Sequence, residues 1–144
     1  MPIANLSVQD ARARQEQGAT LLDVRSTREY AAGHPAGSVN VPVMEHDEDT
    51  DQLLPNPDFV RVVKANFATD TPLLVSCQSG VRSVRASQML ESFGYQDVAN
   101  VLGGYGGARD GSAPGWQPSG LPVDTATSEG AAYQDLLGKA DERT

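Results

Sequence analysis

Short apolar runs alternate with longer stretches of helical periodicity along this chain. Four runs with a bias toward β-branched residues predict buried strands at residues 20–24, 38–41, 73–75 and 98–101. Helical stretches are expected at residues 7–17 and 26–32, from residue 56 onward, and at residues 83–93. Because strands that alternate with helices form parallel sheets covered by helices, the pattern predicts an α/β domain. Its central, mostly parallel sheet should be flanked by helices.

The expected helices have recognisable ends and apolar faces. Ser7, three residues before Asp10, is typical of a helix cap, and Gly18 ends that helix. Asn56 is expected to cap the third helix, with Pro57 at its first helical position. Apolar faces are predicted for the last two helices, from Phe59, Val62, Val63 and Phe67, and from Ala86, Met89, Leu90 and Phe93.

Composition changes toward the C-terminus. We expect one domain over residues 1–123, followed by a polar extension over residues 124–144. Residues 131–139 predict a short helix that packs on the domain through Tyr133, Leu136 and Leu137. The alternative is a frayed, disordered tail.

The chain is acidic, and its charge limits the classes of molecule that it can bind. Its 11 basic and 19 acidic residues give a net charge of −8, which excludes nucleic-acid binding through a broad basic surface. Five carboxylates within residues 45–51 predict a solvated loop, because they lack the regular spacing of a calcium loop. His34 and His46 are the only histidines, so we expect no metal and no cofactor.

Neither a membrane helix nor a disulfide is expected. No apolar run approaches the ~20 residues that a membrane helix needs. The first residues lack the charged and then apolar layout of a secretory signal. Cys77 is the single cysteine, which excludes an intramolecular disulfide. We therefore expect no membrane contact and a cytoplasmic or similarly reducing location.

The candidate chemistry lies between a buried strand and a helix, in the sequence Cys-Gln-Ser-Gly-Val-Arg at residues 77–82. Open α/β sheets bind ligands at the carboxyl ends of their strands, where Cys77 stands. The next helix directs its N-terminal amides and positive dipole end to the same point. Gly80 allows the loop to curl, and Arg82 adds a positive charge. These effects favour a thiolate, so Cys77 is predicted to be a nucleophile beside an anion site.

At these residues the chain resembles the rhodanese family. Three signatures occur in order between about residues 6 and 123. They are Leu22-Asp23-Val24-Arg25 with Glu29-Tyr30, Gly33-His34 and Gly37-Ser38-Val39-Asn40-Val41-Pro42; then Cys77-Gln78-Ser79-Gly80-Val81-Arg82-Ser83; then Phe93-Gly94-Tyr95, Val98, Asn100-Val101, Gly103-Gly104 and Gly120-Leu121-Pro122-Val123. The resemblance implies a three-layer rhodanese-like domain. It also implies transfer of sulfane sulfur from a donor such as thiosulfate to cyanide or a thiol.

The resemblance also assigns roles within the site. Cys77 would carry the sulfur as a persulfide, with Asp23, Arg25 and Ser83 as supporting residues. Asp23 would either hydrogen-bond the loop or pair with Arg25. The implied partners are a small sulfur donor, a thiol or cyanide acceptor, and as a further option a protein acceptor. The persulfide would be cradled by the amides of Gln78, Ser79, Gly80, Val81 and Arg82.

Two positions depart from the family pattern. Members usually carry an aromatic residue four positions after the glycine pair, where this chain has Ala108, and its only tryptophan is Trp116. An inserted loop rich in Gly, Pro and Ser is therefore predicted within residues 106–115. Gln78 stands where many thiosulfate-using members carry a basic residue.

Three charged or titratable residues near the signatures have simpler expected roles. We expect Arg28 to form a surface salt bridge and Glu29 to pair with a nearby arginine. His34 lies between a glycine and a proline, and its ring is expected to hydrogen-bond the backbone of a turn.

Two other functions remain open. Cysteine-dependent phosphatases and arsenate reductases have related loops with five residues between Cys and Arg. Only four separate Cys77 from Arg82, and the smaller ring suits one sulfur atom better than a phosphate. The other alternative is a non-catalytic or sulfur-relay interaction module. Inactive members of such families typically lose the nucleophile, which this chain retains.

Overall fold

A five-stranded sheet forms the centre of the computed structural model, which describes residues 3–142. Its strands are β1 (Ala4–Leu6), β2 (Thr20–Asp23), β4 (Val39–Asn40), β7 (Leu73–Ser76) and β8 (Val98–Val101). Their order is β1-β8-β7-β2-β4, and every neighbouring pair is parallel. The predicted α/β fold with a central parallel sheet is confirmed, and β1 is an additional edge strand.

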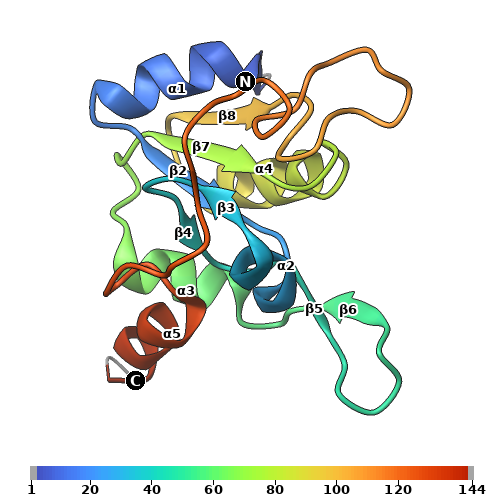
Figure 1. Cartoon of the computed structure of the whole chain (residues 1–144). Helices are drawn as coiled ribbons and strands as arrows, with labels where there is room; N and C mark the ends of the chain where they lie inside the picture. The colour runs from blue at the N-terminus through green and yellow to red at the C-terminus, as the bar shows by residue number, and fades with distance from the viewer. Residues whose placement is uncertain (1–2, 143–144) are drawn as a thin grey trace.

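Helices cover both faces of the sheet (Figure 1). They are α1 (Val8–Glu16), α2 (Thr27–Ala32), α3 (Phe59–Asn66), α4 (Arg82–Ser92) and α5 (Tyr133–Glu142). Because successive strand residues point to opposite faces, the core is split in two. Leu21 and Leu74 pack with α1, whereas Leu22 and Val75 pack with α3, α4 and α5. The result is the three-layer arrangement expected from the sequence.

The first two helices begin as predicted. The Ser7 hydroxyl accepts a hydrogen bond from the Asp10 N–H at 3.1 Å. Ser26 and Glu29 form a reciprocal capping box at the start of α2, and Gly33 follows its last turn. This box fixes the position of the Glu29 carboxylate, which reaches the candidate site.

The start predicted for the third helix is wrong by two residues. α3 begins at Phe59, with Asp58 in the capping position. The Asn56 side chain accepts a hydrogen bond from the Asp58 N–H at 3.1 Å and donates one to the Pro42 carbonyl at 2.9 Å. Asn56 therefore stabilises the turn before the helix and ties it to the neighbouring segment.

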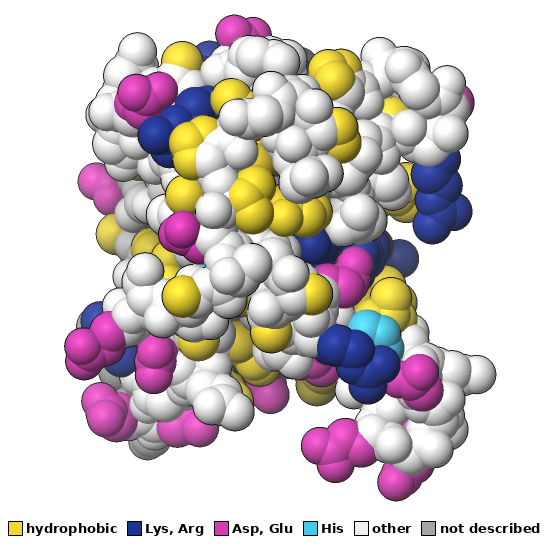
Figure 2. Space-filling view, viewed as in Figure 1, with side chains coloured by type: hydrophobic (Ala, Val, Ile, Leu, Met, Phe, Trp, Pro, Cys, Tyr) yellow, Lys and Arg dark blue, Asp and Glu magenta, His cyan; other side chains and the backbone are white. Residues whose placement is uncertain are grey.

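The acidic segment is a hairpin rather than a plain solvated loop. β5 (Met44–His46) and β6 (Leu53–Pro55) pair antiparallel, and the hairpin projects from the body of the molecule (Figure 1). The Glu45 carboxylate accepts hydrogen bonds from the Thr27 N–H and hydroxyl at 3.0 and 2.8 Å. The sequence-based expectation is thus wrong for Glu45, which anchors the hairpin to α2. Acidic side chains do gather at the hairpin tip (Figure 2).

The chain after residue 122 returns to the body of the fold. β9 (Val123–Asp124) pairs antiparallel with β3 (His34–Pro35). The helix predicted near the C-terminus is present as α5, which packs against α3 and buries Leu136 and Ala140 in the main core. Arg61 also pairs with Asp141 at 3.0 Å. The hydrophobic core therefore includes residues of this C-terminal segment.

One residue expected on the buried face of α4 lies outside it. Ala86 and Leu90 are fully buried, but Phe93 follows the last helical residue and is 52% exposed. Its ring lies 5.7 Å from the Lys64 ammonium.

Within residues 3–142, no helix is long and apolar enough to cross a membrane. In the same described part of the chain, no three or more His, Cys, Asp or Glu side chains gather as metal ligands would.

Candidate active site

The candidate nucleophile stands at the carboxyl edge of the sheet. Cys77 directly follows β7, which pairs with β8 on one side and β2 on the other. The loop then runs for four residues to Arg82, the first residue of α4. Cys77 is only 1% exposed. The structure therefore brings the predicted loop to the edge where α/β folds bind ligands, with its thiol at the base of the loop.

Among residues 3–142, two polar groups lie within hydrogen-bonding distance of the sulfur. The Gly80 N–H donates a hydrogen bond to Sγ of Cys77 at 3.1 Å, and the Ser83 hydroxyl oxygen lies 3.4 Å from the same atom. Gly80 has a φ of +93°, a conformation that favours glycine and turns its amide toward the sulfur. The loop thus presents a hydrogen-bond donor to charge on Sγ.

A glycine-rich segment after β8 clamps the loop from outside. The N–H of Tyr105 donates to the Cys77 carbonyl at 2.7 Å, and the N–H of Gly106 donates to the Gln78 carbonyl at 2.9 Å. A Cβ on Gly104 would overlap the Cys77 carbonyl, so this close backbone approach requires glycine. Sequence reasoning found this glycine pair only as a signature and missed its role as the clamp.

Trp116 supports the clamp. Its N–H donates to the Gly104 carbonyl at 2.8 Å, and its indole N–H donates to the Pro122 carbonyl at 2.7 Å. Its side chain is 1% exposed and packs with the α1 side of the core. The segment between Gly104 and Trp116 folds back on itself, since the Ala108 N–H donates to the Ala113 carbonyl at 3.0 Å.

Asp23 and Arg25 form a buried ion pair behind the loop. The guanidinium makes paired contacts with the Asp23 carboxylate, the shortest at 2.8 Å, and both side chains are about 97% buried or more. Its remaining N–H groups donate to the Gly33 carbonyl at 2.8 Å and to Oε1 of Gln78 at 3.2 Å. The guanidinium also lies 4.4 Å from the centroid of the Tyr105 ring. Of the two roles considered for Asp23, the structure supports pairing with Arg25. Arg25 in turn holds the Gln78 side chain through a hydrogen bond.

Arg82 is paired with Glu29 on α2. Its two terminal nitrogens contact the two carboxylate oxygens at 2.7 and 2.8 Å. Burial raises the pKa of Glu29, but the hydrogen bonds and charge of Arg82, together with Ser26, lower it to about 2. The pKa of Arg82 is raised by its hydrogen bonds to Glu29 and by the nearby negative charges of Glu29 and Asp23. The expected positive charge at the loop is therefore largely balanced by a carboxylate.

The remaining residues named in the sequence analysis lie at the outer side of the loop or form the ion pair and hydrogen bond expected of them. Ser79 is partly exposed and Val81 is 67% exposed, so both lie at the outer side of the loop. Arg28 forms an exposed salt bridge with Asp51 at 2.6 Å. Nδ1 of His34 lies 2.7 Å from the Tyr30 carbonyl, which confirms the expected ring-to-backbone hydrogen bond.

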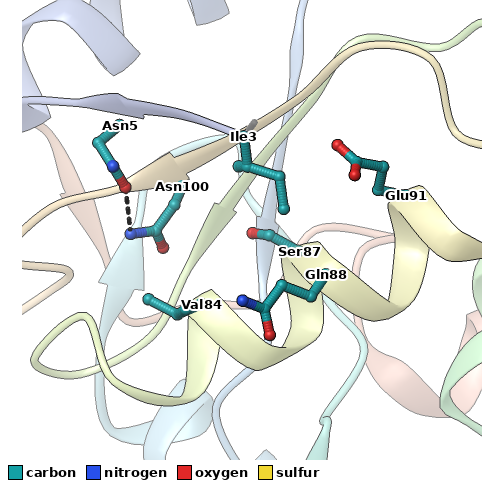
Figure 3. Close-up of a pocket in the computed structure, with 7 residues that line it drawn as sticks. All are labelled: Ile3, Asn5, Val84, Ser87, Gln88, Glu91 and Asn100. Atoms are coloured by element: carbon teal, nitrogen blue, oxygen red, sulfur yellow. Dashed lines mark hydrogen bonds between the residues drawn. The ribbon is translucent and has the colours of Figure 1, made fainter. Parts of the chain in front are cut away.

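Among the hollows that adjoin α4, two lie on different sides of the helix. One, of about 330 Å³, adjoins the loop through Val81 and Arg82. The other, of about 290 Å³, lies between α4 and strands β1 and β8 (Figure 3). Its polar lining includes Asn100, whose amide donates to Asn5 at 3.1 Å, while Oδ1 of Asn100 is buried and finds no partner among residues 3–142. The lining of this second hollow includes none of residues 77–82, so of these two hollows we assign the first to the neighbourhood of the site.

The chain is similar to known proteins in sequence and in fold. A family model described as "Rhodanese-like domain" matches residues 7–109. The chain is 35% identical to "Thiosulfate sulfurtransferase 16, chloroplastic" of Arabidopsis thaliana, over 74% of this chain and 80% of that protein. It is 31% identical to "Thiosulfate sulfurtransferase GlpE" of Haemophilus influenzae, over 87% of this chain and 98% of the relative. Some other relatives are longer, and the chain spans about 60% of their length.

Solved structures share the fold. The crystal structure of Rv0390 from M. tuberculosis superposes with a TM-score of 0.71 at 23% sequence identity. The match covers 88% of this chain and all of that structure.

Proposed function

Because the chain belongs to the rhodanese-like domain family, we propose that it is a sulfurtransferase that carries sulfane sulfur as a persulfide on Cys77. The family implies a sulfur donor and a sulfur acceptor in general. We propose thiosulfate or a related small molecule as the donor, and cyanide, a small thiol or a protein thiol as the acceptor. A cytoplasmic or similarly reducing location would keep the carrier thiol reduced.

The first step loads the cysteine. The Cys77 thiolate attacks the outer sulfur of thiosulfate, a bond forms between Sγ and that sulfur, and the sulfur–sulfur bond of the donor breaks. Its electron pair leaves on sulfite. The Gly80 amide at 3.1 Å from Sγ supports this step, because a hydrogen-bond donor stabilises negative charge on the sulfur.

The second step unloads the cysteine. An acceptor nucleophile attacks the outer sulfur, the new bond forms as the bond to Sγ breaks, and the electron pair returns to Sγ as a thiolate. Cys77 is the only cysteine of the chain, so no second thiol of the chain can attack from within, and the acceptor must be external. The loop amides of residues 78–82 would cradle the persulfide, and Asp23, Arg25 and Ser83 would hold the loop in shape.

The observation that carries the proposal is the place of Sγ, 3.1 Å from the Gly80 N–H and 3.4 Å from Ser83 at the end of the central strand. We would measure steady-state transfer from thiosulfate to cyanide by wild type and by Cys77→Ser. Wild type should turn over and Cys77→Ser should not, while both unfold in urea at similar concentrations. Appreciable turnover by a folded Cys77→Ser would exclude Cys77 as the carrier. A wild type inactive with both cyanide and thiols would favour the interaction-module alternative.

A further inference from the structure

The hollow beside the loop has the size and lining of a small-molecule site. Its volume of about 330 Å³ falls at the lower end of the range for ligand pockets. The hairpin contributes Met44 and Pro55, and the loop and α4 contribute Val81, Arg85 and Met89. Val43, Asn56 and Arg82 complete the lining, so five of its eight side chains are apolar. The hollow therefore offers a mostly apolar surface with two arginines in its lining.

Val81 lines this hollow and also belongs to the loop that surrounds Sγ of Cys77. It lies between Gly80, whose amide contacts Sγ of Cys77, and Arg82, which begins α4. It is nonetheless 67% exposed, and Leu54 of the neighbouring hairpin is 44% exposed. Apolar side chains this exposed at the outer side of a reactive loop are available for contact with the body of a substrate.

Charge distinguishes Arg85 from the other arginines of the region. Arg25 is neutralised by Asp23, and Arg82 is neutralised by Glu29. Arg85 is exposed and forms no ion pair with any other residue between 3 and 142. In a chain of net charge −8, an unbalanced cation beside an apolar hollow is complementary to an anionic group on an otherwise apolar ligand.

We propose that this hollow binds the organic part of a thiol acceptor that combines an apolar body with a carboxylate. The apolar body would lie against Met44, Val81 and Met89, and the carboxylate would meet Arg85. The proposal rests on the proposed function and names the acceptor class of the same site. In the reaction, the acceptor thiolate attacks the outer sulfur of protonated Cys77 persulfide, the bond to Sγ breaks, and Sγ keeps the electron pair. The products are an organic persulfide, which keeps the proton on its outer sulfur, and the Cys77 thiolate.

Two acceptors that share a six-carbon chain test the carboxylate contact, namely mercaptohexanoate and mercaptohexanol. The readout is the ratio of their kcat/KM values with thiosulfate as donor at low ionic strength. Because exposed ion pairs contribute up to about 1 kcal/mol, the ratio should be about three to five in wild type. It should fall to about one in Arg85→Gln and shrink at high salt. Arg14→Gln removes the same charge on α1, across the sheet, and should retain the wild-type ratio.

The apolar contact has its own test. Met89→Ser should lower kcat/KM for both six-carbon thiols relative to mercaptoethanol, because it shortens the apolar surface. A wild-type ratio near one, or an equal loss of the ratio in Arg85→Gln and Arg14→Gln, would overturn the proposal. Cyanide turnover by wild type distinguishes a failure of the acceptor assignment from a failure of the proposed function. If cyanide accepts sulfur while the thiols are not distinguished, only the acceptor assignment fails, whereas no transfer to any acceptor contradicts the proposed function itself.

Discussion

Replacing Glu29 with Gln removes one partner of the ion pair that holds Arg82 beside the cysteine loop. Burial raises the pKa of Glu29, and Arg82 and Ser26 lower it more strongly, to about 2 from an ordinary value of 4.5. One pKa unit corresponds to about 1.4 kcal/mol, so this difference corresponds to about 3 kcal/mol of stability. The side chains of Glu29 and Arg82 are 25% and 17% exposed, which reduces the contribution to about 2 kcal/mol. We expect Glu29→Gln to be less stable than wild type by this amount at neutral pH.

The lowered pKa fixes the direction of the pH dependence. Above the unfolded value of 4.5, Glu29 is ionised in both states and its full contribution is present. As pH falls from about 4.5 toward about 2, protonation removes that contribution. Glutamine carries no charge at any pH. The stability difference between wild type and Glu29→Gln should therefore be constant above about pH 5 and shrink below it.

Urea unfolding followed by circular dichroism measures this difference at a series of pH values. Glu48→Gln, on the exposed hairpin tip, is the matched control and should change stability by less than about 0.5 kcal/mol. The two stabilities are compared at neutral pH and at the lowest pH at which both proteins stay folded. If the stability difference between wild type and Glu29→Gln is equally large at both pH values, the ion-pair explanation is refuted.

Asp23→Asn should destabilise the fold by about 3–5 kcal/mol in urea unfolding, because it leaves the guanidinium of Arg25 buried without its counter-charge; a loss below about 1 kcal/mol would contradict this. Gly104→Ala should lower sulfur transfer at least about tenfold, because its Cβ would displace the Cys77 carbonyl and with it the loop. Gly120→Ala, also at positive φ but facing open space, should lose only about 1 kcal/mol of stability and retain its transfer rate, and equal activity losses in the two variants would count against the clamp.

The central layers of the fold were predictable because they depend on local pattern. The apolar runs at β2, β7 and β8 and the glycine after the first helix are strong signals, and they mark the sheet and its connections. β1 was missed because three residues, of which the central Asn5 is polar, give no periodicity. The hairpin β5–β6 was missed because its carboxylates suggest a solvated loop, whereas Glu45 is held by Thr27 from a distant part of the chain.

The candidate site shows the same division between local and tertiary information. The loop from Cys77 to Arg82 follows from sequence, since its strand, glycine and helix are contiguous. The partner of Arg82 does not, because Glu29 lies 53 residues earlier and reaches the loop only through the capping box of α2. The clamp by Gly104 likewise depends on two strands that end at the same edge of the sheet. Contacts of this kind determine the charge at the loop. They join residues that are far apart in the sequence, so they can be identified only once the fold is known.

The most direct test of the central claim is the intact mass of the protein after incubation with thiosulfate and after later addition of cyanide. The account predicts one added sulfur atom on wild type, lost again with cyanide, and no addition to Cys77→Ser. An unchanged mass of wild type after thiosulfate and after a persulfide donor, or a sulfur retained by Cys77→Ser, would contradict a persulfide carried by Cys77.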